Sequence, residues 1–264
     1  MSRNPHDWPA LIRVRPHVVL TNVITVVLVA WAAMVAVDVL QIAGSRPTPL
    51  WVLLFNDGLV EWIQWLLLPA TVFASGFLVA RLLDSSDRGA ANFFLFFGIG
   101  LALMLIEDAG DIRHAIRSLV HLSIGDRILG VQTGLVVEVP YFLLLAAVPL
   151  YALARYGRYV WGHTRTRRLL VAGYGLYAVA AGASAFRILG DFYVVTGRWI
   201  DDNLFAGRLA VPSGQSQQYA HFYLVDGPIE ESVETIAAAC LLGVALAFAS
   251  QFHEESGAAD DHDR

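Results

Sequence analysis

Long apolar runs alternate with short polar connections along most of the 264 residues of this chain. Several runs reach about 16 to 20 residues, close to the roughly 20 that a helix needs to cross a bilayer. The pattern predicts an all-α polytopic membrane protein, a bundle of about six transmembrane helices. The expected spans are 18–42, 58–83, 89–114, 128–155, 169–195 and 228–252, with a cytoplasmic segment at 1–17 and an acidic disordered tail at 253–264.

The composition agrees with this pattern and excludes several classes of protein. Hydrophobic residues make up 56% of the chain and charged residues 16%, against about 25% charged in soluble domains. The helices use nearly all of the chain, which leaves no room for a soluble catalytic domain or a nucleic-acid-binding module. All 18 basic residues are arginine. A retinal or pyridoxal Schiff base needs a lysine amine, so both cofactors are excluded as covalent ligands.

The arginines are distributed unevenly among the polar connections, and this predicts an orientation. Arginines lie in the first segment and in the connections near residues 81–88 and 155–168, which fall on one side of a six-span topology. Cytoplasmic connections carry an excess of basic residues. We therefore expect a multi-pass protein of the cell membrane with both termini in the cytoplasm, although six further arginines fall on the opposite side.

Ionisable residues recur at a similar depth in five of the expected spans. A rise of 1.5 Å per residue, counted from the basic end of each span, puts these residues at about 26 to 30 Å. They are Glu61, Glu107, Glu138, Arg187 and Glu234. Hydrocarbon is about 30 Å thick, and ionisable groups inside it commonly mark functional sites. The sequence therefore predicts an acidic layer in the outer half of the bundle.

A structural alternative exists for some of these carboxylates. Glu61 and Glu230 follow residues typical of helix starts, and the helix dipole favours an anion there. The alternative fits span 89–114 less well, because only residues 93–106 are continuously apolar and the acidic turn must complete the crossing. Glu107, Asp111 and His114 are spaced by four and three residues, which predicts one shared helix face.

The order of carboxylates along the chain is similar to that of four-helix di-metal proteins, which use Glu from two helices and Glu-x-x-His from two others. The predicted ligands occur in the order Glu61, Glu107, Asp111, His114, Glu138, Glu231 and Glu234. This chain departs from that pattern, because Asp111 replaces one Glu and Glu234 replaces one His. An oxygen-rich site with one imidazole favours Mn, Fe or Mg.

The leading hypothesis is a metal-dependent membrane enzyme that acts on a lipid or another amphiphile near the outer face. The predicted catalytic residues are Glu107, Asp111, Glu138 and Glu230, and the predicted substrate-binding residues are Arg187, Asp191 and His221. Two alternatives stay open: a cation- or proton-coupled transporter or channel that uses the same carboxylates, and a membrane subunit or scaffold. The expected partners are membrane lipids and an amphiphilic or cationic small ligand, and homo-oligomerisation stays open.

The connection between the last two expected spans is predicted to act as a lid. It runs from Arg198 to Tyr219 and contains Gly, Ser, Gln and Pro. Asp201 lies in this connection, outside the predicted acidic layer. We therefore expect Asp201 to be peripheral and Asp201→Asn to be nearly silent.

Overall fold

The computed structural model describes residues 12, 14–44, 46–56, 58–85, 87–125, 127–128, 130–187 and 191–262, with side chains except at 185–187 and 254–262. The chain divides into two compact units. Unit 1 comprises residues 1–20, 65–174 and 238–264, and unit 2 comprises residues 21–64 and 175–237.

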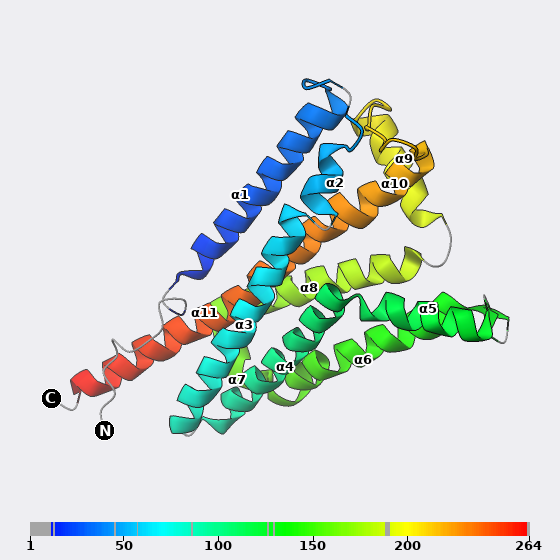
Figure 1. The fold of residues 1–264 in the computed structure, drawn as a ribbon. Coiled ribbons are helices and arrows are strands. Elements are labelled where there is room, and N and C mark those ends of the chain that lie inside the picture. Colours follow the sequence, from blue (N-terminus) through cyan, green and yellow to red (C-terminus); the bar gives the residue numbers. More distant parts are fainter. Residues whose placement is uncertain are drawn as a thin grey trace. The chain divides into compact units, whose positions relative to one another are not determined.

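Helices dominate both units (Figure 1). Four helices have residues in both units: α1 (Pro16–Met34), α3 (Leu59–Asp84), α8 (Thr164–Arg187) and α11 (Glu230–His262). Unit 1 also contains α4 (Arg88–Gly110), α5 (Ile112–Ile124), β1 (Arg127–Ile128), β2 (Val131–Gln132), α6 (Thr133–Tyr156) and α7 (Arg158–Trp161). Unit 2 also contains η3 (Val35–Val39), α2 (Leu50–Phe55), α9 (Phe192–Leu204), α10 (Gln217–Leu224) and η4 (Val225–Ile229), where η marks a π-helix.

Five helical segments among the described residues are long and apolar enough to cross a membrane. They are Pro16–Val39, Leu50–Asp84, Arg88–Gly110, Thr133–Tyr156 and Gln217–His253. These segments agree with an all-α, multi-pass membrane protein. The predicted span 169–195 falls on α8, which is not among the five, and it continues over residues 188–190, outside the described part. The count of six spans and their bundle arrangement stay predictions.

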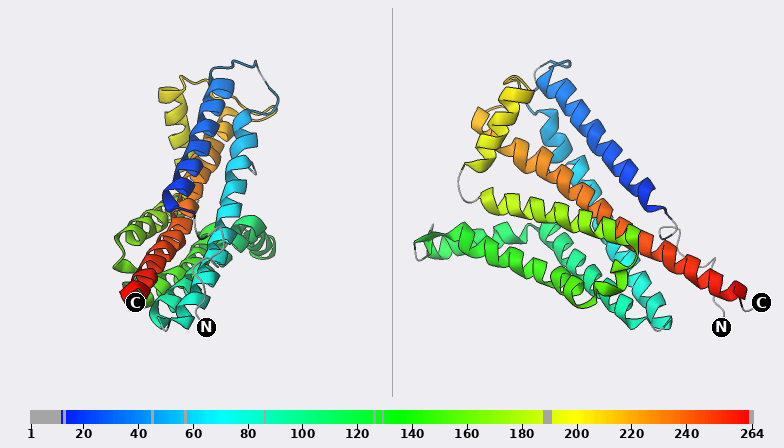
Figure 2. Two further views of the ribbon diagram at one scale, coloured as in Figure 1. Left: turned by 90° about the vertical axis from the view of Figure 1, so that its left-hand side faces the viewer. Right: turned by 180° about the vertical axis from the view of Figure 1, so that it is seen from behind.

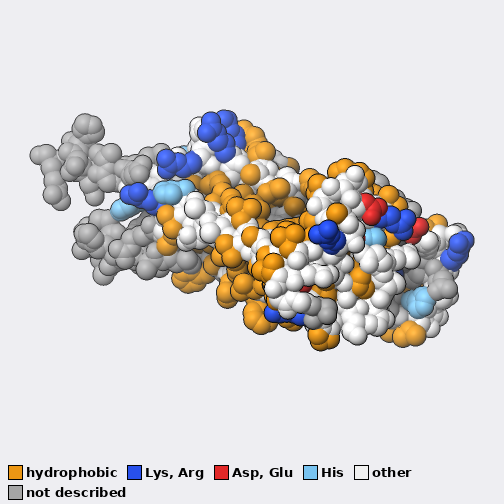
Figure 3. Space-filling model, turned by 90° about the horizontal axis from the view of Figure 1, so that it is seen from above, with side chains coloured by type: hydrophobic (Ala, Val, Ile, Leu, Met, Phe, Trp, Pro, Cys, Tyr) orange, Lys and Arg blue, Asp and Glu red, His pale blue; other side chains and the backbone are white. Residues whose placement is uncertain are grey.

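Many large apolar side chains are exposed, as expected for helices that contact lipid. Leu66 of α3 is 71% exposed, Leu144 of α6 is 69% exposed, and Leu28 of α1 is 63% exposed. On the face drawn in Figure 3, hydrophobic side chains cover much of the surface between a few groups of charged ones. Contact with hydrocarbon, rather than with water, accounts for such a surface.

In unit 1, α4 packs closely against α6. A Cβ atom on Gly100 of α4 would lie 3.1 Å from Cδ of Pro149 of α6, so glycine allows the close approach of the two helices. Phe93, Phe94 and Phe97 are fully buried on α4, and the Phe94 ring lies 4.8 Å from the Phe248 ring of α11. The Asp87 side chain caps the start of α4 by accepting a hydrogen bond from the Ala90 amide.

The expected span 89–114 is interrupted. α4 ends at Gly110, and Asp111 adopts a left-handed conformation with φ of 47° before α5 begins. Asp tolerates this conformation better than most residues. In Figures 1 and 2, α5 continues beside α6, and a two-stranded antiparallel hairpin of β1 and β2 connects the two helices. The break places residues on either side of Asp111 on separate helices.

In unit 2, the core is built around Trp51 and Phe55 of α2, which are fully buried with Val60 and Leu224. Asp38 of η3 is 2% exposed and caps α2, because its carboxylate accepts hydrogen bonds from the amides of Leu50 at 2.8 Å and Trp51 at 2.7 Å. Asp38 therefore holds the beginning of α2 against the end of the first helix.

Candidate functional site

Glu107 sits near the end of α4 and has three partners in unit 1. The Tyr141 hydroxyl of α6 donates to Oε2 at 2.6 Å, and the Arg113 amide donates to the same oxygen at 3.1 Å. The Arg113 guanidinium Nε lies 3.6 Å from Oε1, with both side chains 13% exposed. The break at Asp111 makes this possible, because it turns the first residues of α5 back toward the end of α4.

Glu138 of α6 is the most completely buried carboxylate among the described side chains of unit 1. Its side chain is 0% exposed, and Oε1 accepts a hydrogen bond from the Arg117 guanidinium of α5 at 2.9 Å. The other oxygen, Oε2, is buried and has no hydrogen-bond partner among the described residues. Arg117 differs from its partner because 45% of its side chain is exposed. A fully buried anion is therefore matched by a cation at the surface of the unit.

These contacts form one polar ladder, which we call the α5–α6 ladder: Glu107, Arg113, Arg117, Glu138 and Tyr141. Arg113 and Arg117 are one turn apart on α5, and Glu138 and Tyr141 are one turn apart on α6. The Arg113 guanidinium also lies 4.7 Å from the Phe142 ring centroid, a cation–π distance. The two arginines of α5 thus contact carboxylates from two helices, Glu107 of α4 and Glu138 of α6.

Further polar residues of unit 1, among them the predicted ligands Asp111 and His114, lie near the junction of α4 and α5. Asp108 accepts a hydrogen bond from the Trp65 indole at 2.9 Å. His114 Nδ1 and Asp111 Oδ1 are in contact, and both side chains are exposed. Asp111 ends one helix and His114 lies on the next, so the single face predicted for Glu107, Asp111 and His114 is wrong.

Unit 2 contains a second group of carboxylates on α11. Glu230 accepts hydrogen bonds from the hydroxyls of Ser184 of α8 and Tyr193 of α9, the latter at 2.6 Å. Glu234 accepts a hydrogen bond from the Gln64 amide at 3.0 Å. Glu61 and Glu231, the other predicted ligands of unit 2, also have interaction partners. Hydroxyl and amide donors thus surround the first turn of this long helix.

Asp201 and His221 form a buried pair that the sequence did not predict. Asp201 of α9 is 1% exposed and its Oδ2 lies 3.0 Å from Nε2 of His221 of α10. The same carboxylate accepts hydrogen bonds from the Leu209 amide at 3.0 Å and the Gln217 side chain at 2.9 Å. The expectation that Asp201 is peripheral is therefore wrong. In the sequence, Asp201 lies in a helix of mixed apolar and polar residues, 20 residues before His221.

Asp191 and Arg187 are the other two predicted substrate-binding residues. Asp191 is exposed and precedes α9 without forming a side-chain cap. The side chain of Arg187 lies outside the described part, so its predicted role as an anion clamp is untested. His221 Nδ1 is buried without a hydrogen-bond partner among the described residues, whereas its Nε2 lies 3.0 Å from Oδ2 of Asp201 and 3.4 Å from Nε2 of Gln217.

The predicted acidic layer is divided between the two units. Glu107, Asp111, His114 and Glu138 belong to unit 1, and Glu61, Glu230, Glu231 and Glu234 belong to unit 2. Within the described residues, no group of three or more His, Cys, Asp or Glu side chains is arranged to hold a metal ion. Metal binding stays a prediction.

No family model, curated protein or solved structure matches this chain. The function is therefore inferred from side-chain geometry. The Glu138 carboxylate keeps one buried oxygen without a hydrogen-bond partner in the part of the chain that the structure describes.

Proposed function

We propose that this protein is a proton-coupled membrane carrier or proton channel in which Glu138 is the proton-binding residue. The observation that carries the proposal is the state of the Glu138 carboxylate: completely buried, bound to Arg117 through one oxygen, and unmatched at the other among the described residues. An ionised group in such surroundings loses hydration that one partner restores only in part.

Two states of the carboxylate follow from this geometry. In the first, Glu138 is ionised and bound to Arg117, as described above. In the second, a proton or another small cation binds Glu138, and the Arg117 side chain moves into contact with water. The second state is accessible because Arg117 is already 45% exposed and reaches the carboxylate from the edge of the interface.

Glu107 of α4 provides a second carboxylate in the same ladder. Its carboxylate accepts a hydrogen bond from the Tyr141 hydroxyl and lies beside the Arg113 guanidinium. Both of these groups can form hydrogen bonds with other partners. Hydroxyls and carboxylates in sequence are the usual means of proton movement through membrane proteins. The ladder supplies such a sequence along the α5–α6 interface.

The metal-dependent enzyme is the second candidate, and it is favoured by the first turn of α11. Glu230, Glu231 and Glu234 lie within one turn there, and hard divalent cations prefer carboxylate oxygens. In unit 1, by contrast, the guanidinium groups of Arg113 and Arg117 place positive charge 3.6 Å from Glu107 and 2.9 Å from Glu138, which opposes a divalent cation there. The α5–α6 ladder therefore supports proton binding better than metal binding.

Proton movement into proteoliposomes tests the proposal. The purified chain is reconstituted, a potassium diffusion potential is imposed, and a trapped pH-sensitive dye reports the internal pH. We expect the wild-type protein to acidify the interior and Glu138→Gln to abolish the change. Asp202→Asn, which alters an exposed carboxylate, serves as the control and should behave like the wild type. Equal proton movement in all three proteins would contradict the proposal.

A further inference from the structure

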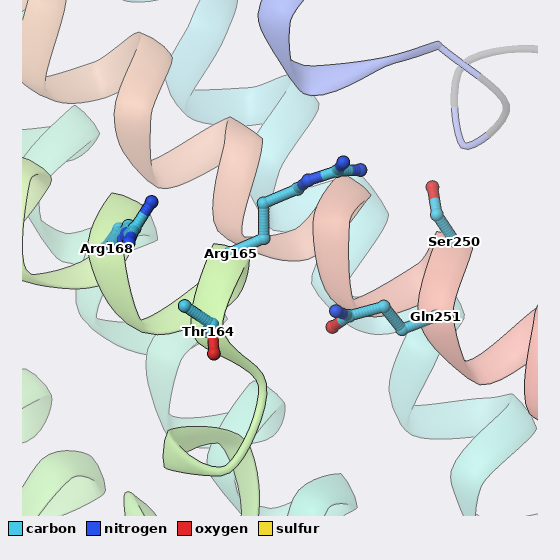
Figure 4. A pocket seen from close by; sticks show the side chains of 5 residues that line it. All are labelled: Thr164, Arg165, Arg168, Ser250 and Gln251. Atoms are coloured by element: carbon cyan, nitrogen blue, oxygen red, sulfur yellow. The ribbon is translucent and has the colours of Figure 1, made fainter.

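A polar pocket of about 360 Å³ lies in unit 1, far along the chain from the α5–α6 ladder. It is formed by the first turns of α8 and by the part of α11 near Ser250, as Figure 4 shows. The lining residues are Thr164, Arg165, Arg168, Ser250 and Gln251. In Figure 4, the Arg165 side chain extends toward α11 and the Gln251 side chain extends toward α8. The pocket therefore combines two guanidinium groups with hydroxyl and amide groups.

The two arginines provide a strong positive charge in this pocket. Arg165 and Arg168 are three residues apart on α8, so they lie on the same helix face. Among the described side chains, neither guanidinium forms an ion pair. Guanidinium groups bind phosphate oxygens through paired, charge-assisted hydrogen bonds, and the hydroxyl and amide groups can donate further hydrogen bonds to the same anion.

The position of the two helices at this pocket is fixed by contacts beneath it. Thr166 of α8 is fully buried, and its hydroxyl lies 3.5 Å from Oε1 of Gln251 of α11. The His163 ring, just before α8, lies 5.1 Å from the Phe248 ring of α11. The lining groups are therefore held by packed side chains, and the pocket does not depend on the arginines for its shape.

Two exposed aromatic residues indicate the level of this pocket relative to a membrane. Tyr159 and Trp161 of α7 precede the pocket by a few residues and are 38% and 44% exposed. Exposed tyrosine and tryptophan side chains concentrate at the headgroup level of a bilayer. Basic pockets between transmembrane helices on the cytoplasmic side bind anionic headgroups, and the arginine distribution predicts that this side is cytoplasmic.

We infer that this pocket binds the phosphate of an anionic phospholipid, held by Arg165 and Arg168. The shared chemistry is a phosphate group, which could also come from free inorganic phosphate. The exposed aromatic residues a few positions before the pocket favour the phospholipid, because such side chains concentrate at the headgroup level of a bilayer. This binding is independent of the proposed proton movement at Glu138.

Native mass spectrometry of the full chain released from nanodiscs tests this inference. The nanodiscs contain phosphatidylglycerol in phosphatidylcholine, and the number of retained phosphatidylglycerol molecules is measured. We expect the wild type to retain this lipid, and Arg165→Gln and Arg168→Gln each to weaken retention by about tenfold. Arg167→Gln removes the same charge from the same turn of α8 but does not line the pocket, so it should retain the lipid as the wild type does.

The remaining outcomes overturn the inference. Equal loss in Arg167→Gln and Arg168→Gln would mean a general attraction between basic residues and the anionic surface. Displacement of phosphatidylglycerol by millimolar inorganic phosphate, with a matching rise in the unfolding temperature, would mean a site for free phosphate. Retention unchanged in both pocket variants, with each variant eluting as the wild-type species in size-exclusion chromatography, would mean that the lipid binds elsewhere.

Discussion

Nε2 of His221 lies 3.0 Å from Oδ2 of Asp201, and the two side chains are 7% and 1% exposed. A carboxylate can only accept, so the imidazole N–H donates. The pair joins α9 to α10 in unit 2, and the Leu209 amide and the Gln217 side chain complete the shell of Asp201. Asp201, which lies in the connection that was predicted to act as a lid, thus holds α9 and α10 together.

Asp201→Asn should destabilise the protein. The side-chain amide of the introduced asparagine would direct an N–H group toward the N–H donors of Gln217 and His221. These buried donors would then lack an acceptor. The expected loss is about 1–3 kcal/mol of unfolding free energy. Thermal unfolding in detergent measures the effect, with Asp202→Asn as the matched control, because Asp202 is the exposed neighbour. Identical unfolding temperatures for the two variants would mean that the Asp201 contacts do not contribute to stability.

Gly197→Ala should separate α9 from α10. A Cβ atom at Gly197 would lie 1.9 Å from the backbone oxygen of His221, a distance that requires the backbone to move. Overpacking of this kind costs at least about 1–3 kcal/mol. Gly182→Ala on α8 is the control, because nothing lies within 4 Å of its added methyl group and alanine favours a helix. We expect a lower unfolding temperature only for Gly197→Ala.

The apolar pattern predicted most of the helices, because the length of an apolar run is set by the bilayer and does not depend on tertiary contacts. The expected spans 18–42, 58–83, 128–155 and 228–252 each overlap a helical segment that is able to cross. The break at Asp111 was not predicted, since it depends on a single left-handed residue. Helix periodicity assumed continuity there and placed His114 on the wrong helix face.

The partners of the candidate residues could not be predicted from the sequence alone. Glu138 was predicted as a metal ligand and a catalytic residue, and it contacts Arg117, 21 residues earlier. Arg117 was not among the predicted site residues. Asp201 was missed because its partners, the Leu209 amide and the Gln217 and His221 side chains of α10, lie 8, 16 and 20 residues further along the chain. Such contacts depend on how the helices pack, which residue spacing does not encode.

The topology prediction is tested by reporter fusions. Reporters after Ser123 and Ser213 should report the outside of the cell, and one after His163 should report the cytoplasm, since the arginines of the connection around His163 favour the inner side. The fusion at His163 decides the orientation, because an external signal there would invert it and would move the proposed phospholipid pocket to the opposite leaflet.

The metal prediction is tested by elemental analysis of the purified protein. If Glu107, Asp111 and His114 are ligands, Mn, Fe or Mg should copurify near one equivalent and His114→Ala should deplete it. His121→Ala, on the same helix and outside the predicted ligand set, is the control. A folded, proton-conducting protein without such a metal would remove the metal-dependent enzyme from consideration and leave the proton-coupled carrier or channel.

The most direct test of the central claim is an infrared difference spectrum of the reconstituted protein, recorded with and without an imposed proton gradient. A buried carboxyl group that gains a proton gives a carbonyl stretching band, so the wild type should show one. Glu138→Gln should remove this band, whereas Asp202→Asn should leave it unaltered. A band that persists unchanged in Glu138→Gln would contradict the assignment of Glu138 as the proton-binding residue.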